Sequence, residues 1–131
     1  MNDQEAQFDT PLPGTVVPDA IASGLLKAFI AKFRGIDPPE VPGNLPTACV
    51  LKGRKDSDYL HRDSFASRKN ILVWFEAAKL LHQTTPKEIL KYLEERQPWE
   101  DYDICLFDET LLWCVGITHN DDVIVDERNN T

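Results

Sequence analysis

The amino-acid sequence predicts an α+β fold in which an antiparallel sheet of three to five strands carries two or three helices packed on one face. The chain has 131 residues, which fits one domain, and 42% of them are hydrophobic while 27% are charged. Amphipathic helical patterns lie in its first two thirds, and short apolar runs separated by tight turns fill its last third. These observations together favour one globular domain with its own core.

The domain is expected to span residues 19–126, between two peripheral segments. Residues 1–18 contain three prolines and a glycine with little apolar periodicity, so we expect a flexible or extended N-terminal arm. Residues 127–131 are polar and are expected to form a frayed tail.

The first predicted helix covers residues 18–34. Its apolar residues recur close to every 3.6 positions, and Gly35 follows as a C-terminal cap. Four prolines in residues 36–46 exclude helix and sheet there and predict a loop. The apolar run at 47–51 predicts a short buried strand, and the polar residues 52–63 predict a long excursion.

Residues 71–82 fit either of two structures. Ile71–Phe75 is rich in β-branched and aromatic residues, which favours a strand, yet apolar residues of 71–81 also fit one helical face. We expect a strand at 71–75 that continues into a helix at 76–82. The next helix is better defined, because Thr85, Pro86 and Glu88 form a capping box that starts a helix over residues 86–96.

The C-terminal third predicts a β-meander. Its strands are expected at residues 102–107, 111–119 and 123–126, and the turns at 108–110 and 120–122 are short and polar. Connections of this length favour antiparallel hairpins.

The charge distribution argues against two classes of partner. Residues 1–70 hold nine acidic and nine basic residues, whereas residues 71–131 hold thirteen acidic and five basic ones, so the second half carries the whole net charge of −8. Nucleic acid and anionic membranes are bound by clusters of Lys and Arg, which this balance disfavours. The charge leaves a basic protein surface or a cation as the partner.

The cysteine content and the N-terminal sequence predict a cytoplasmic protein. No apolar run approaches the length of about 20 residues that a bilayer span needs, and the acidic N-terminus does not resemble a secretory signal. Cys49, Cys105 and Cys114 are odd in number and lie in apolar stretches, so we expect buried, reduced thiols.

Known catalytic and metal-binding motifs are missing from the sequence. There is no GxSxG elbow, GxGxxG loop, Walker loop, HExxH or CxxC, so no catalytic residue, metal site or cofactor is assigned. His61, His82 and His119 stand apart in the sequence. If the chain is an enzyme, His119 is the best candidate for an acid–base group, because a strand end next to a turn can face a cleft. We would then expect a concave pocket with His119 or His61 beside a second polar group.

An acidic run with interspersed aromatic residues is the strongest functional signal. Trp and Tyr beside charged residues are typical of protein–protein hot spots. The competing interpretation is a solvated acidic face above core aromatic residues. The predicted partner-binding residues are Trp99, Glu100, Asp101, Tyr102, Asp103, Asp108, Glu109, Trp113, Asp121 and Asp122.

The stretch YDICLFDETLLWCVGITHNDDVIV resembles the C-terminal meander of small acidic bacterial immunity-type proteins, which neutralise toxins. The resemblance covers about a fifth of the chain and matches no single family. Its most specific feature is the order of acidic residues, Trp113, Thr118 and His119, with acidic residues after them. It implies a protein that binds and blocks a toxin without performing chemistry.

We therefore expect a non-enzymatic cytoplasmic binding protein, with an immunity or inhibitor protein that masks a basic toxin as the leading hypothesis. The alternative is a small enzyme or ligand-binding domain whose histidine-based site is assembled only in the fold. A regulatory subunit of a larger complex is a third hypothesis.

Overall fold

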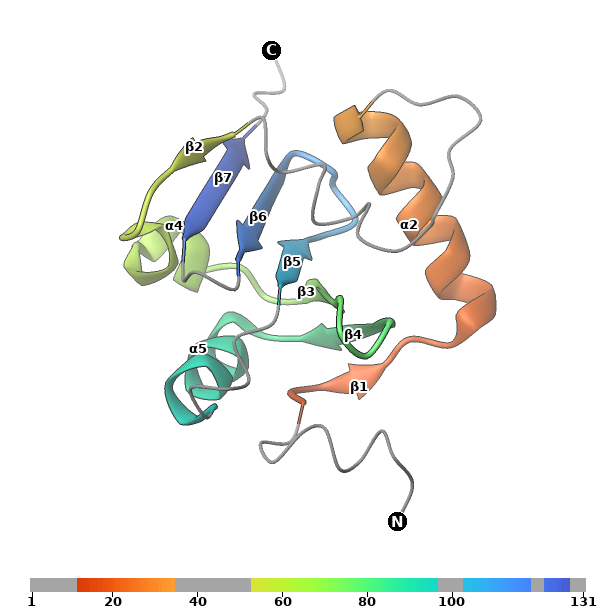
Figure 1. The fold of residues 1–131 in the computed structure, drawn as a ribbon, viewed down its shortest axis with the longest axis horizontal. Coiled ribbons are helices and arrows are strands. Elements are labelled where there is room, and N and C mark those ends of the chain that lie inside the picture. Colours follow the sequence, from red (N-terminus) through yellow and green to blue (C-terminus); the bar gives the residue numbers. More distant parts are fainter. Residues whose placement is uncertain (1–11, 35–52, 97–102, 119–121, 128–131) are drawn as a thin grey trace.

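The structure is a computed structural model that describes residues 12–34, 53–96, 103–118 and 122–127. Seven strands in these residues form one antiparallel sheet, in the order β1-β4-β3-β5-β6-β7-β2 (Figure 1). The strands are β1 (Thr15–Val16), β2 (Arg54–Lys55), β3 (Ile71–Phe75), β4 (Leu80–Thr84), β5 (Ile104–Phe107), β6 (Trp113–Ile117) and β7 (Val123–Glu127). The α+β class is confirmed, but the sheet has more strands than the three to five predicted.

Helices lie on both faces of this sheet and not on one face as predicted. The helices are α2 (Asp19–Arg34), α4 (Asp63–Ala66) and α5 (Pro86–Glu95), and a 3₁₀ turn, η2, covers Tyr59–His61. One core joins α2 to alternate strand residues such as Leu72 and Trp74, and the other joins α4, α5 and η2 to the residues between them, such as Val73. Figure 1 shows α2 on one side of the sheet and α4 and α5 on the other.

The two cores explain why the central strands are apolar throughout. β3, β5 and β6 are buried at every position, so their sequences are continuous apolar runs without the polar alternation of a one-sided antiparallel sheet. That missing alternation is a signal in the sequence that predicts two covered faces. The prediction of helices on one face did not use it.

The helix predicted at residues 76–82 is wrong. The chain turns after β3, where Lys79 donates its backbone N–H to the Phe75 carbonyl and adopts a φ of 56°. β4 then pairs with β3 along five residue pairs, with Trp74 opposite Leu81. The hairpin buries Leu81 against α2 while His82 faces the other core, an alternation that a helix cannot provide.

Two further boundaries differ from the prediction. The predicted arm contains an edge strand, because Thr15 and Val16 pair with β4, and the predicted tail begins too early, because Glu127 belongs to β7. The excursion predicted at 52–63 contains β2, which pairs with β7, and η2.

The remaining elements follow the prediction closely. α2 matches the helix expected at 18–34, and β5, β6 and β7 form the expected meander. Thr85 caps α5, since its Oγ1 accepts the Glu88 backbone N–H at 3.3 Å. The predicted loop at 36–46 and strand at 47–51 lie outside the described residues. None of the described helices is long and apolar enough to cross a bilayer.

Candidate partner-binding surface

The structure describes half of the predicted partner-binding residues. Asp103, Asp108, Glu109, Trp113 and Asp122 lie within the described residues, whereas Trp99, Glu100, Asp101, Tyr102 and Asp121 lie outside them.

The described acids occupy opposite ends of the meander. Asp108 and Glu109 form the turn after β5, whereas Asp103 precedes β5 and Asp122 precedes β7 at the other end. At about 3.4 Å per residue, the two ends of β5 place Asp103 and Asp108 about 17 Å apart. The predicted acids that the structure describes therefore form two groups and not one continuous patch.

Trp113 is a core residue, contrary to its predicted place in a contact surface. It is 1% exposed, and its ring packs edge-on against Phe65. The Arg68 guanidinium lies over its ring at 4.2 Å from the centroid, a cation–π arrangement. Trp113 therefore lies beneath Arg68 in the core, where no partner side chain can reach its ring.

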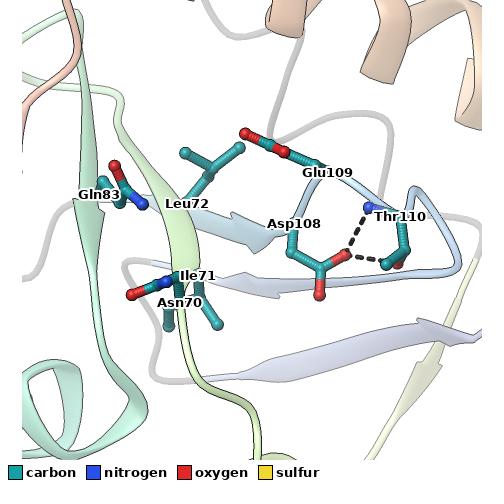
Figure 2. Close-up of a pocket in the computed structure, with 7 residues that line it drawn as sticks. All are labelled: Asn70, Ile71, Leu72, Gln83, Asp108, Glu109 and Thr110. Carbon is teal, nitrogen blue, oxygen red and sulfur yellow. Dashed lines mark hydrogen bonds between the residues drawn. The ribbon is translucent and has the colours of Figure 1, made fainter.

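The turn after β5 holds Asp108 in a fixed orientation. Its carboxylate Oδ1 accepts the Thr110 backbone N–H at 2.9 Å and the Thr110 hydroxyl (Figure 2). Its carbonyl accepts the Leu111 N–H at 3.2 Å. Leu111 completes the turn with a φ of 57°, which is uncommon for a bulky residue. Glu109 stands at the exposed tip of this turn.

A hollow of about 200 Å³ opens beside this turn. Figure 2 shows that three neighbouring segments line it, namely the start of β3, the end of β4 and the β5–β6 turn. Its lining residues are Asn70, Ile71, Leu72, Gln83, Asp108, Glu109 and Thr110. The hollow is smaller than the roughly 300–1,000 Å³ of typical cofactor or drug pockets, and its size suits one side chain better.

The lining of the hollow suits a basic side chain. Asp108 and Glu109 supply carboxylates, and Asn70 and Gln83 supply amide groups, each of which has an oxygen that accepts and an NH2 that donates hydrogen bonds. Leu72 adds an apolar wall, against which the methylene stem of a Lys or Arg can pack. Acidic and amide acceptors around an apolar wall are the groups that a long cationic side chain contacts.

Bases from the first half of the chain already pair with several meander acids. Arg54 lies 3.4 Å from Glu127, and Lys55 lies 3.6 Å from Asp122. Both pairs are well exposed to solvent, so each contributes only about 0–1 kcal/mol and exchanges readily with other partners. These pairs make the net negative charge around the meander smaller than the sequence of residues 71–131 alone predicts.

Arg68 neutralises Asp108 only in part. Its Nη1 lies 3.9 Å from the Asp108 carboxylate, at the limit of an ion pair, while Nη2 donates to the Tyr59 hydroxyl at 3.2 Å. That hydroxyl also lies 3.4 Å from the Glu127 carboxylate, and burial raises the pKa of Tyr59. Glu109 has no ion-pair partner among the described residues. Glu109 is therefore the acid of the hollow whose charge is least compensated.

Neither of the two histidines that the structure describes lines the hollow beside the β5–β6 turn. His61 is exposed on η2, His82 is buried on β4, and His119 lies outside the described residues. No group of three metal-ligating side chains occurs within the described ranges.

Sequence reasoning missed Asn70, Gln83 and Arg68 as residues of this site. They lie 25 or more residues away from the β5–β6 turn, and only the pairing of β3 with β4 and β5 brings Asn70 and Gln83 to it. No local pattern predicts that pairing.

Comparison of the chain with family models, with curated proteins and with solved structures finds no match.

Proposed function

We propose that this protein is a non-enzymatic binding protein that docks a basic partner protein on its C-terminal meander. The hollow beside the β5–β6 turn is the point where a Lys or Arg side chain of the partner enters. One observation carries the proposal. Residues 97–127 contain nine acidic residues and no Lys or Arg, and Asp108 and Glu109 of this stretch line a hollow together with the amide side chains Asn70 and Gln83.

Electrostatics would act mainly on how fast the partner arrives and which partner is selected. A surface with one sign of charge steers an oppositely charged protein and raises the association rate, more than it strengthens the final complex. The exposed pairs of Arg54 with Glu127 and Lys55 with Asp122 do not prevent this, because a partner's cations can replace them at little cost.

The narrower form of the proposal is an immunity or inhibitor protein that masks a basic toxin in the cytoplasm. The resemblance of the meander to immunity-type proteins supports it. The side chains of Cys105 and Cys114 are buried in the core, as expected of cysteines that serve as small apolar residues. The product of a neighbouring gene is the first partner to test, by asking whether it arrests growth alone and whether co-expression of this protein restores growth.

The direct test is association kinetics with that partner at two salt concentrations. Glu109→Lys reverses the least compensated charge of the hollow without touching the hydrogen bonds of Asp108, which hold the turn. Glu94→Lys is the matched control, since Glu94 is exposed on α5, away from the hollow. We expect Glu109→Lys to lower the association rate several-fold at 0.01 M salt, where the Debye length is about 30 Å, and much less at 0.15 M, where it is about 8 Å.

Equal effects of the two reversals would contradict docking at the hollow. An association rate that neither salt nor Glu109→Lys changes would contradict a basic partner altogether and would leave the acidic meander as a solubility feature.

A further inference from the structure

The N-terminal segment Leu12–Val17 covers the outer edge of β4 with few contacts. Thr15 and Val16 pair with Gln83 and His82, and the Val17 N–H donates to the Leu81 carbonyl at 2.8 Å. Both β1 residues are exposed, Val16 by 55%, whereas Pro13 and Val17 on either side of them are buried. By contrast, β4 holds to β3 through five residue pairs. Loss of the contacts between the segment and β4 would therefore leave the pairing of β4 with β3 in place.

His82 joins this segment to the core. Its side chain is 8% exposed, and its Nδ1 lies 3.0 Å from the Pro13 carbonyl oxygen. Because a carbonyl oxygen only accepts hydrogen bonds, Nδ1 carries the proton and Nε2 presents a lone pair in the neutral ring. Nε2 is buried and has no hydrogen-bond partner among the described residues. The described contacts therefore fit the neutral imidazole and leave no acceptor for a second N–H.

The surroundings of His82 disfavour its charged form. The neighbouring strands β1 and β3 carry no titratable side chain. The imidazole of His82 packs edge-to-face with the ring of Phe75, and the two ring centroids lie 5.2 Å apart. On the α5 side, Glu88, Lys91, Tyr92 and Glu95 line a second hollow together with Leu12, Pro13 and Gly14. Burial lowers the pKa of His82, the Pro13 carbonyl opposes this, and no charged group of α5 contributes.

Gly14 allows the segment to approach β4 this closely. Its φ is 78°, in the left-handed region, and a Cβ at this position would lie 2.0 Å from the Gln83 carbonyl oxygen. Any other residue would have to push the segment away from β4. Substitution of Gly14 thus offers a way to open the segment without changing His82.

We propose that His82 is a proton-sensitive latch, which holds residues 12–17 on the edge of β4 when neutral and releases them when protonated. Release returns the imidazole to water and uncovers the backbone groups of β4 that pair with β1 and Val17. The direction follows from linkage. With the segment closed the pKa lies below its ordinary value of about 6.5, so closure is complete above pH 6.5, weakens as pH falls toward the lowered pKa, and levels off below it.

Amide hydrogen exchange of the full-length protein between pH 8 and pH 4.5 tests the latch. Each protection factor is corrected for the intrinsic exchange rate at that pH. The Val17 amide should lose up to about tenfold protection per pH unit within the window, because one proton is linked to opening. The Leu106 amide, in the central strand β5, should keep its protection over the same range.

Two variants and one control complete the test. His82→Gln should make Val17 protection independent of pH, while His61→Gln, at an exposed histidine, should leave the wild-type profile unchanged. Gly14→Ala should open the segment at every pH and, by reciprocity, move the His82 pKa, measured by NMR titration of the ring protons, back toward its ordinary value. This second readout remains available if His82→Gln fails to fold.

Val17 protection that does not change with pH in the wild-type protein would overturn the latch. So would a pH-dependent loss that persists in His82→Gln, or a His82 pKa that Gly14→Ala leaves in place.

Discussion

Replacement of Arg68 by Met tests how the acidic hollow is anchored to the core. The guanidinium stacks on Trp113, donates to the Tyr59 hydroxyl and approaches the Asp108 carboxylate. Its side chain is 23% exposed, so these contacts are partly shielded from water. Met keeps most of the apolar stem but removes all three polar contacts.

The contacts give an expected cost of about 2 kcal/mol. A partly buried cation–π contact contributes about 1 kcal/mol, and the hydrogen bond to the Tyr59 hydroxyl adds about 1 kcal/mol. The ion pair to Asp108, at 3.9 Å, adds little. For a chain of this length, a loss of about 2 kcal/mol corresponds to a fall of about 7 °C in Tm.

The assay is urea unfolding followed by tryptophan fluorescence and by circular dichroism. Lys69→Met is the matched control, because it removes one positive charge from the neighbouring exposed residue. We expect Arg68→Met to lower the unfolding midpoint clearly and Lys69→Met to leave it nearly unchanged. If the two variants unfold at the same midpoint, Arg68 does not act through the contacts described here.

Three further predictions concern stability and the thiols. Thr85→Ala should lower the free energy of unfolding by about 1 kcal/mol, while Thr85→Ser should retain it, and equal midpoints would contradict the cap. Lowering the pH from 8 to 5 should destabilise the wild-type protein more than His82→Gln, because the folded protein holds the pKa of His82 below its unfolded value; parallel pH profiles would contradict this. Cys105 and Cys114 should resist alkylation in the folded protein, and intact mass should show three modified thiols after unfolding, whereas a mass two units low before reduction would contradict reduced thiols.

The elements with strong local signals were predictable from the sequence. The capping box at Thr85 places the start of α5 at the correct residue, and the short polar turns of the meander predict its hairpins. These signals act over a few residues, so the sequence carries them in full.

Elements that depend on distant residues were not predictable in the same way. The run at 76–82 fits a helical face as well as a strand, and only its pairing with β3 shows that the chain forms the strand β4 there. The pairs that β1 makes with β4 and β2 makes with β7 join residues about 70 apart in the sequence, and each of these edge strands is two residues long. Strands this short carry no periodicity.

The candidate site shows the same division. The sequence identifies Asp108 and Glu109 through the acidic run, but it treats Trp113 as a surface residue because composition alone does not show which face of β6 is covered. Arg68 lies over that ring from a segment 45 residues earlier, and no pattern near Trp113 predicts this contact. Burial and charge compensation are properties of the fold.

A charge-swap cycle with the partner tests the central claim most directly. Glu109→Lys is combined with reversal of individual Lys and Arg residues of the partner, and the dissociation constants of all four combinations give the coupling energy. We expect one partner reversal to restore the binding lost in Glu109→Lys, while the same reversal gives no coupling to Glu94→Lys on α5. If no partner cation couples to Glu109, or if coupling to Glu94 is equally strong, the hollow beside the β5–β6 turn is not where a basic partner docks.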